Sequence, residues 1–327
     1  RGGVAIGDQV LDMAALAEAN LFKGQAKLAV EAAAKSSLNQ LMGLGAKINS
    51  ELRLALSRAL RQGSEYQDQL EPCLIAQANI EFDLPCRIGD YTDFYTSINH
   101  ATAVGRLFRP EQPLLPNYKW ILIGYHGRSS TIGISGQEFY RPLGQVKGAN
   151  GGAPDFGPSK GLDYELEMGI FVGAGNPQGE PIEIESAEQH IFGMCIFNDW
   201  SARDIQAWEY QPLGPFLGKN FASTISPWIV TMEALAPFRV PFSRPDEDPA
   251  PIEYLSSEFN SQFGGLDIQM EVLLQTNKMQ QHDTEAERVA GSSFKHSYWT
   301  VAQMLTHHTV GGCSMNPGDL LGSGTQS

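Results

Sequence analysis

Residues 162–173 read LDYELEMGIFVG, and this stretch decides how the rest of the chain is interpreted. The β-branched and aromatic residues at 170–172 favour a strand, which the glycine at 173 ends. Side chains two apart on a strand point to the same face, so Glu165 and Glu167 are expected to lie together, with their apolar neighbours opposite. Two adjacent carboxylates repel unless a cation or a shared proton lies between them. By itself, such a pair is more often part of a solvated strand face, because acidic side chains are mostly exposed.

The composition limits the class of protein. The chain has 327 residues, 42% of them hydrophobic, with 34 Gly and 19 Pro, as in a turn-rich globular protein of one large or two smaller domains. A net charge of −14 argues against nucleic acid or an anionic membrane as partner, since both require clustered Lys and Arg. Neither a membrane-spanning run nor a secretory signal is visible. Four dispersed cysteines indicate reduced thiols in a cytoplasmic enzyme.

The first 90 residues differ from the rest in their predicted secondary structure. Residues 4–11 predict a hairpin that turns at Gly7 and Asp8. Residues 26–42 and 48–60 are rich in helix-forming Ala, Leu, Lys and Arg. We therefore expect a small N-terminal domain at 1–90. The first residue is Arg1 rather than Met, so we expect the native start to lie upstream.

From residue 91 onward, short β-like runs alternate with loops rich in Pro and Gly. The runs are 120–124, 166–172, 191–197, 228–232 and 268–274. They predict a large, mainly β catalytic domain at 91–327 with few helices.

The segment 198–206, NDWSARDIQ, predicts the start of a helix. Ser201 is a suitable N-cap residue, and Pro212 would end the helix. Arg203, Gln206 and Tyr210 would then share one helix face as three hydrogen-bonding side chains. An ordinary solvated polar face is the alternative interpretation.

Four acids along the chain offer an all-oxygen ligand set: Asp93, Glu165, Glu167 and Asp199. Oxygen ligands select a hard cation such as Ca²⁺ or Mg²⁺ over Zn²⁺. Spacing alone does not select these four from the 37 acidic residues.

Motifs along nearly the whole chain, in the same order, resemble the fumarylacetoacetase family. They are DYTDFY at 90–95, HAT at 100–102, GYHGR at 124–128, LDYELEM at 162–168, NDWSARD at 198–204, GK at 218–219 with SPW at 226–228, FKH at 294–296 with WT at 299–300, LTHH at 305–308, and PGDLL at 317–321 with SGT at 323–325. The resemblance is more specific than any single motif. It implies an α+β, mainly β fold with a small N-terminal SH3-like barrel, a C-terminal β-roll catalytic domain and assembly as a homodimer.

The resemblance also implies a role for each of a set of residues. The metal ligands would be Asp93, Glu165, Glu167 and Asp199, with Lys219 and Ser223 bordering a second cation site. The general base would be His100, and the groups that stabilise the oxyanion would be Arg203, Gln206 and Lys219. The substrate-contacting positions would be Tyr95, Arg109, Tyr125, Gln206, Tyr210 and Thr325.

Two positions depart from the family pattern. Ser223 stands where the family usually carries Thr, a mild change because either residue offers a hydroxyl. The family also supplies, from beyond the position of Ser327, a Glu that orients the catalytic His. We therefore expect the native chain to continue past Ser327.

The implied reaction is metal-dependent hydrolysis of the C–C bond of 4-fumarylacetoacetate, a dicarboxylate β-diketone, to fumarate and acetoacetate. This is the last step of tyrosine and phenylalanine catabolism. A Lewis-acid metal, a base near neutrality such as His100, and oxyanion donors are the groups that such a cleavage needs. The alternatives are an acylpyruvate hydrolase or oxaloacetate decarboxylase of the same family, and a catalytically impaired metal-binding homologue.

Overall fold

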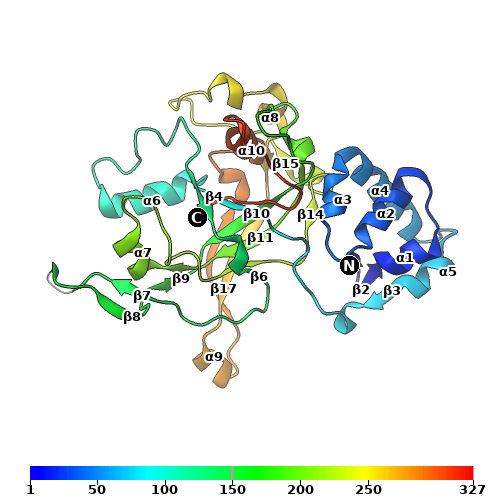
Figure 1. Ribbon diagram of the computed structural model, residues 1–327, viewed down its shortest axis with the longest axis horizontal. Helices are drawn as coiled ribbons and strands as arrows, with labels where there is room; N and C mark the ends of the chain where they lie inside the picture. Colours follow the sequence, from blue (N-terminus) through cyan, green and yellow to red (C-terminus); the bar gives the residue numbers. More distant parts are fainter. Residues whose placement is uncertain (149–150, 327) are drawn as a thin grey trace.

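The computed structural model describes residues 1–148 and 151–326 (Figure 1). A helical N-terminal part lies at one end of the molecule, beside a larger body built on a mixed sheet of eight strands. The fold is a mixture of helices and sheets, which confirms the α+β class, although helices are more numerous than the mainly β prediction implied. Within the described residues, no helix combines the length and hydrophobicity needed to cross a bilayer.

The N-terminal part is a small sheet covered by helices. Its strands are β1 (Gly3–Ile6), β2 (Gln9–Asp12) and β3 (Leu74–Ala76), and its helices are α1 (Met13–Ala19), α2 (Gly24–Ala33), α3 (Asn39–Gly43), α4 (Gly45–Leu60) and α5 (Gln67–Leu70). β1 and β2 form the predicted hairpin, and Gly7 adopts a φ of +59° in its turn. This part has its own core, to which Leu11, Leu16 and Val30 contribute. The SH3-like barrel stays a prediction.

The larger body is organised by one sheet in the order β5–β4–β19–β10–β11–β13–β6, with β14 paired to β11. The strands are β4 (Tyr91–Phe94), β5 (Gly124–Gly127), β6 (Ile132–Ile134), β10 (Leu166–Val172), β11 (Ile191–Asp199), β13 (Ser223–Ile225), β14 (Val230–Thr231) and β19 (Leu320–Gly322). β19 runs parallel to β4 and antiparallel to β10, and β6 runs parallel to β13. The short strand β19 therefore joins two parts of the sheet that are distant in sequence.

β10 lies at the centre of this sheet, and all seven of its residues are buried. The predicted alternation is confirmed, because Ile170 and Val172 pack in one core cluster and Phe171 packs in another. The predicted run begins earlier as a separate strand, β9 (Leu162–Asp163), which pairs with β12 (Ser201–Ala202). The chain thus changes its pairing partner just before β10.

The strand predicted at 120–124 is wrong. The amides of Trp120 and Ile121 donate to the carbonyl of Asn117, which closes a turn, and β5 begins only at Gly124. The run at 228–232 forms a strand only over Val230–Thr231. At Trp120 and Ile121, local hydrogen bonds override β propensity.

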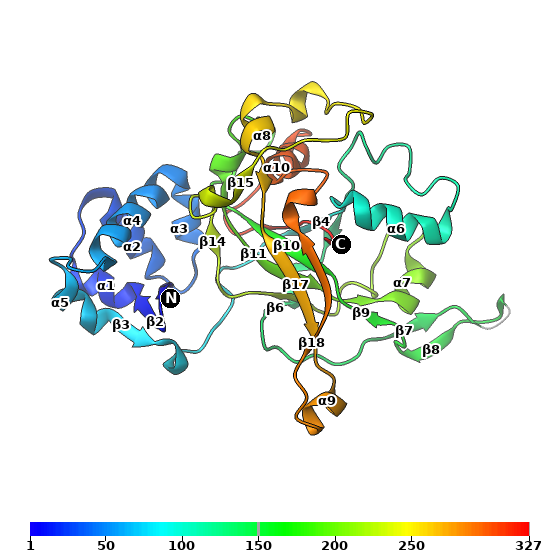
Figure 2. The same cartoon turned by 180° about the vertical axis from the view of Figure 1, so that it is seen from behind.

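The remaining elements are short ribbons and helices around the sheet. The ribbons are β7 (Leu143–Val146) with β8 (Asp155–Pro158), β15 (Arg239–Val240) with β16 (Gly265–Leu266), and β17 (Gln269–Leu274) with β18 (Glu287–Ser293). The helices are α6 (Ile98–Phe108), α7 (Arg203–Glu209), α8 (Glu258–Phe263), α9 (Asn277–Gln281) and α10 (Val301–Thr309). Figure 2 shows the β17–β18 ribbon running across the sheet, with α9 projecting at its tip. Both views place α6 beside α7, on the side of the molecule away from the N-terminal part.

Candidate functional site

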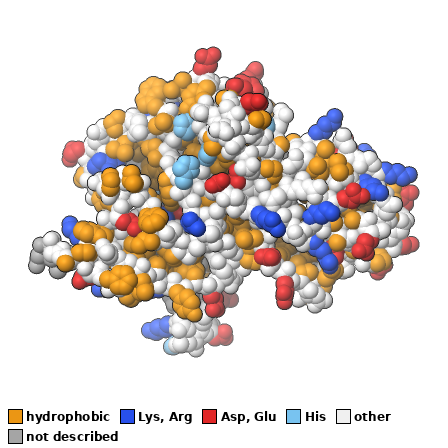
Figure 3. Space-filling model, in the orientation of Figure 1, with side chains coloured by type: hydrophobic (Ala, Val, Ile, Leu, Met, Phe, Trp, Pro, Cys, Tyr) orange, Lys and Arg blue, Asp and Glu red, His pale blue; other side chains and the backbone are white. Residues whose placement is uncertain are grey.

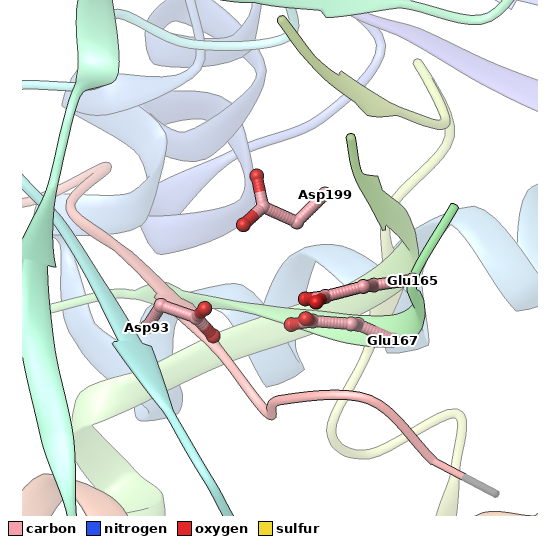
Figure 4. Close-up of side chains that lie close together, drawn as sticks. All are labelled: Asp93, Glu165, Glu167 and Asp199. Carbon is pink, nitrogen blue, oxygen red and sulfur yellow. The ribbon is translucent and has the colours of Figure 1, made fainter. Parts of the chain in front are cut away.

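Four carboxylates converge in the sheet (Figure 4). Asp93 lies on β4, Glu165 just before β10, Glu167 on β10, and Asp199 at the end of β11. One oxygen from each lies within 4.8 Å of the others, and all four side chains are buried. The expectation that Glu165 and Glu167 project together is confirmed, and the solvated-face interpretation is wrong.

Glycines of the β19 segment make room for these acids. A Cβ atom on Gly322 would lie 2.9 Å from Oε2 of Glu167 and 3.1 Å from Oδ1 of Asp93. Gly324 adopts a φ of +74°, and its N–H donates to Oε2 of Glu167 at 2.9 Å. No local sequence pattern predicts this role for the two glycines, because the pairing of β19 with β4 and β10 brings them to the site.

One half of the cluster is already neutralised by polar side chains. Nζ of the buried Lys219 lies 2.6 Å from Oε2 of Glu165 and 2.7 Å from Oδ2 of Asp199. Ser223 donates to Oδ1 of Asp199 at 2.6 Å, and Ser201 donates to Oε1 of Glu165 at 3.2 Å. Burial opposes ionisation, but Lys219 and then Arg203 lower the pKa of Glu165 to about 2.

In the other half of the cluster, two carboxylate oxygens have no hydrogen-bond partner among the described residues. Oδ1 of Asp93 and Oε1 of Glu167 are buried, and within the described ranges neither has a hydrogen-bond partner. Burial, and then neighbouring carboxylates, raise the pKa of both acids well above the usual range. Buried anionic oxygens without a donor fit a hard divalent cation, so the residues present match the ligand set expected for Ca²⁺ or Mg²⁺.

The predicted N-cap role of Ser201 is wrong. Ser201 lies in β12, paired with Asp163 of β9, and its hydroxyl is directed to Glu165. Ala202 occupies the N-cap position of α7, with no side-chain cap. The predicted end of the helix is confirmed, since α7 stops at Glu209, ahead of Pro212.

The guanidinium of Arg203 lies at the start of α7 and borders the carboxylates. Nη2 lies 2.7 Å from Oε1 of Glu165, Nη1 donates to Oε1 of Gln206 at 3.0 Å, and Nε donates to Oδ2 of Asp163 at 2.9 Å. Tyr210, at the end of α7, is half exposed. Arg203 and Gln206 are therefore joined as the helix spacing predicted.

His100 lies in the first turn of α6, whose N-cap Ser97 accepts from the His100 N–H at 3.2 Å. Its imidazole is partly buried and meets the ring of Tyr95 edge-on, with centroids 5.7 Å apart. Burial lowers the pKa of His100, Glu165 opposes this, and Arg203 lowers the pKa further. The ring is therefore neutral at pH 7 and able to accept a proton.

The remaining residues implied as substrate contacts are distributed around this centre. Tyr125, on β5, donates to Oδ2 of Asp199 at 3.4 Å. Burial and Glu165 raise the pKa of Tyr95 to about 12, against the opposing charges of Arg109 and Arg203. Arg109 itself is exposed and donates to the carbonyl of Pro113. Thr325 is half-buried in the segment after β19.

The geometry defines a class of protein before any comparison is made. A buried all-oxygen cluster that could hold a divalent metal, bordered by Lys219, Arg203 and a neutral His100, is typical of a hydrolytic enzyme centre.

Comparison with known proteins assigns the family. The model "Fumarylacetoacetate (FAA) hydrolase C-terminal" matches residues 91–327, and "Fumarylacetoacetase N-terminal" matches residues 1–85. Fumarylacetoacetase of Rattus norvegicus is 49% identical over 333 residues, covering 100% of this chain and 77% of the relative. That of Dictyostelium discoideum is 48% identical over 337 residues, covering 100% and 76%. The chain belongs to the fumarylacetoacetase family.

A solved structure supports the fold independently. Maleylpyruvate hydrolase from Sphingobium sp. SYK-6, in complex with manganese(II) ion and pyruvate, superposes with a TM-score of 0.52 over 99% of this chain and 85% of the other. At 16% identity this likeness concerns the fold alone.

Proposed function

We propose that this chain is a divalent-metal-dependent hydrolase that cleaves the C–C bond of 4-fumarylacetoacetate, yielding fumarate and acetoacetate at the end of tyrosine and phenylalanine catabolism. The main observation behind the proposal is the buried cluster of four carboxylates, two of which have an oxygen without a donor among the described residues. Relatives named fumarylacetoacetase, 45–49% identical over essentially the whole chain, support the choice of substrate.

Asp93, Glu165, Glu167 and Asp199 would hold the metal, which when bound supplies a Lewis acid for the diketone oxygens. Both Ca²⁺ and Mg²⁺ accept oxygen ligands, so the preference between them is a matter for titration. The second cation site implied near Lys219 and Ser223 would share Asp199 with them, because both side chains already contact that carboxylate.

Side chains of the protein would supply the general base and the oxyanion donors. The neutral His100 takes a proton from water, and its lowered pKa keeps it competent down to mildly acidic pH. Arg203 and Lys219 direct cationic donors toward the developing oxyanion. Gln206 accepts from Arg203 through Oε1, which leaves its amide nitrogen as a further donor.

Substrate recognition is assigned to the groups around this centre. Arg109 is exposed at the end of α6 and offers a guanidinium for one carboxylate of the substrate. Tyr95, Tyr125, Tyr210 and Thr325 offer hydroxyls for the remaining polar atoms.

We also propose that the chain has two domains, at 1–90 and 91–327, and that the first contains an SH3-like barrel. The protein would act as a homodimer in the cytoplasm. The separate N-terminal core and the two family models support the domains. Figure 3 shows hydrophobic side chains on the face that carries α7 and the β7–β8 ribbon, where Leu213 is 95% and Phe156 74% exposed. Such a patch favours a protein partner. Sedimentation at twice the chain mass of 35.7 kDa would support the dimer.

The decisive experiment is turnover of 4-fumarylacetoacetate, measured as loss of the diketone absorbance and formation of fumarate in the presence of Ca²⁺ or Mg²⁺. Acylpyruvates and oxaloacetate, assayed in parallel, test the two alternative enzymes of the family. His100→Ala should abolish turnover and leave metal binding by calorimetry unchanged. Substantial residual turnover would remove His100 as the base, and absence of turnover in the wild type on all substrates would favour the metal-binding homologue.

A further inference from the structure

The guanidinium of Arg203 is held on three sides, and one of its three partners has no role in the site so far. Glu165 is a proposed metal ligand and Gln206 a proposed oxyanion donor. The third partner, Asp163, accepts from Nε at 2.9 Å. It does not belong to the four-carboxylate cluster.

The backbone fixes Asp163 opposite Arg203. Asp163 lies on β9 and pairs with Ser201 of β12, two residues before Arg203. The N–H of Arg203 donates to the carbonyl of Gly161 at 2.7 Å, which ties the start of α7 to the same ribbon. Oδ1 of Asp163 accepts from the N–H of Tyr164 at 3.0 Å, so Oδ2 is directed to the guanidinium. The backbone therefore helps to orient the carboxylate toward Arg203.

Glu165 alone would not fix the orientation of Arg203. Its Oε1 is shared between Arg203 and Ser201, and its Oε2 is bound by Lys219. Gln206 accepts from Nη1 at 3.0 Å, but through a neutral amide oxygen. The contact from Asp163 to Nε is the third constraint on the guanidinium, and it adds a charged partner that lies outside the metal cluster.

We propose that Asp163 is a positioning residue, which holds the plane of Arg203 so that its terminal nitrogens face the reacting carbonyl; this inference rests on the proposed function. Oxyanion donors act through preorganisation, so a loosened donor lowers the rate of the chemical step more than it weakens substrate binding. An exposed ion pair without such a role would change turnover little when broken.

The test compares Asp163→Ala and Asp163→Asn with the wild type. Alanine should lower kcat on the order of 10–100-fold, less than loss of a whole oxyanion donor, while KM stays within about threefold. The kcat of Asp163→Asn should lie between those of the alanine variant and the wild type, because the amide oxygen still accepts from Nε but carries no charge. The affinity of a tetrahedral phosphinate analogue of the substrate should fall in parallel with kcat. Metal affinity should not change, since Asp163 is not a ligand.

Asp267→Asn is the matched control. Asp267 also forms a half-exposed ion pair, with Lys295 at 3.1 Å, but it lies on the segment before β17. Its substitution should leave kcat and analogue affinity unchanged. If Asp163→Ala lowers the melting temperature but keeps kcat per metal site, Asp163 is only structural and the proposal is wrong.

A second readout does not depend on turnover. The Nε–H proton of Arg203 can be followed by ¹⁵N NMR and identified by its loss in Arg203→Lys. Its exchange with water should accelerate at least about tenfold in Asp163→Ala, because a hydrogen bond protects it in the wild type. Unchanged exchange overturns the proposal, and so does unchanged kcat. If the wild type does not cleave fumarylacetoacetate, the proposed function fails, and the exchange rate alone decides whether Asp163 orients Arg203.

Discussion

Replacing Glu167 by Gln should have opposite effects on the metal-free and the metal-bound protein. Glu167 is fully buried, its Oε1 has no partner among the described residues, and its Oε2 accepts from Gly324. Glutamine keeps the shape and the acceptor but removes the charge. Without metal, the variant should be more stable than the wild type, because one of four mutually repelling carboxylates is gone.

The magnitude follows from the separation of the carboxylates. At 4.8 Å, the limit between the ligand atoms, two unit charges repel by about 3.5 kcal/mol at an effective dielectric constant of about 20. Burial, and then Asp93 and Glu165, raise the pKa of Glu167, so part of this repulsion is already relieved by protonation at neutral pH. We expect a gain of about 1–2 kcal/mol at pH 7, which raises the melting temperature of a chain of this size by roughly 1–3 °C.

The pH dependence has a definite sign. A carboxyl whose pKa is raised on folding does not destabilise the protein below its unfolded pKa, and the destabilisation grows as the pH rises from the unfolded pKa toward the folded pKa. The advantage of the Gln variant should therefore be small at pH 5 and larger at pH 9.

The assay is thermal unfolding of chelator-treated protein, followed by titration with Ca²⁺ and Mg²⁺. Loss of one anionic ligand should weaken metal binding by roughly a hundredfold or more, equivalent to about 2.7 kcal/mol. This exceeds the gain of the metal-free variant, so the variant should be the less stable protein at metal concentrations that saturate the wild type. Glu271→Gln, which changes an exposed acid paired with Arg288, should show neither effect. A destabilised metal-free Gln variant, or unchanged metal affinity, would refute the reasoning.

Two further predictions concern the same centre. Gly322→Ala should weaken metal binding at least roughly tenfold, because its Cβ would lie 2.9 Å from Oε2 of Glu167. The control is Gly311→Ala, whose Cβ meets no atom within 4 Å. Equal calorimetric affinities for the two variants would contradict the prediction. Glu165→Gln should weaken metal binding and lower kcat together, because it removes an anionic ligand and the charge that holds Arg203; wild-type affinity by calorimetry would remove Glu165 from the ligand set.

Features set by local pattern could be predicted from the sequence. The hairpin around Gly7 and the central strand β10 depend on turn geometry and on alternation of apolar residues, and both formed as expected. The shared face of Glu165 and Glu167 followed from the strand period. Selecting Asp93 and Asp199 as their companions needed the family resemblance, because each comes from a different strand.

Features set by long-range pairing could not be predicted in this way. Ser201 has the chemistry of an N-cap, but the β9–β12 ribbon directs its hydroxyl to Glu165 instead. Trp120 and Ile121 have high β propensity, yet their amides donate to the carbonyl of Asn117 in a turn. No sequence pattern indicated a role for Asp163, because the β9–β12 ribbon brings its partner Arg203 to it.

The position of β19 has a consequence for the order in which the protein folds. The N–H of Gly324, which follows β19, donates to Glu167 although 157 residues separate them, and β19 lies between β4 and β10 in the sheet. Contacts of such large sequence separation form slowly, because a long loop must close first. The complete ligand set thus exists only after the β19 strand has inserted. The rate at which refolding protein acquires metal affinity should therefore measure this insertion, a late event that far-ultraviolet circular dichroism would barely register.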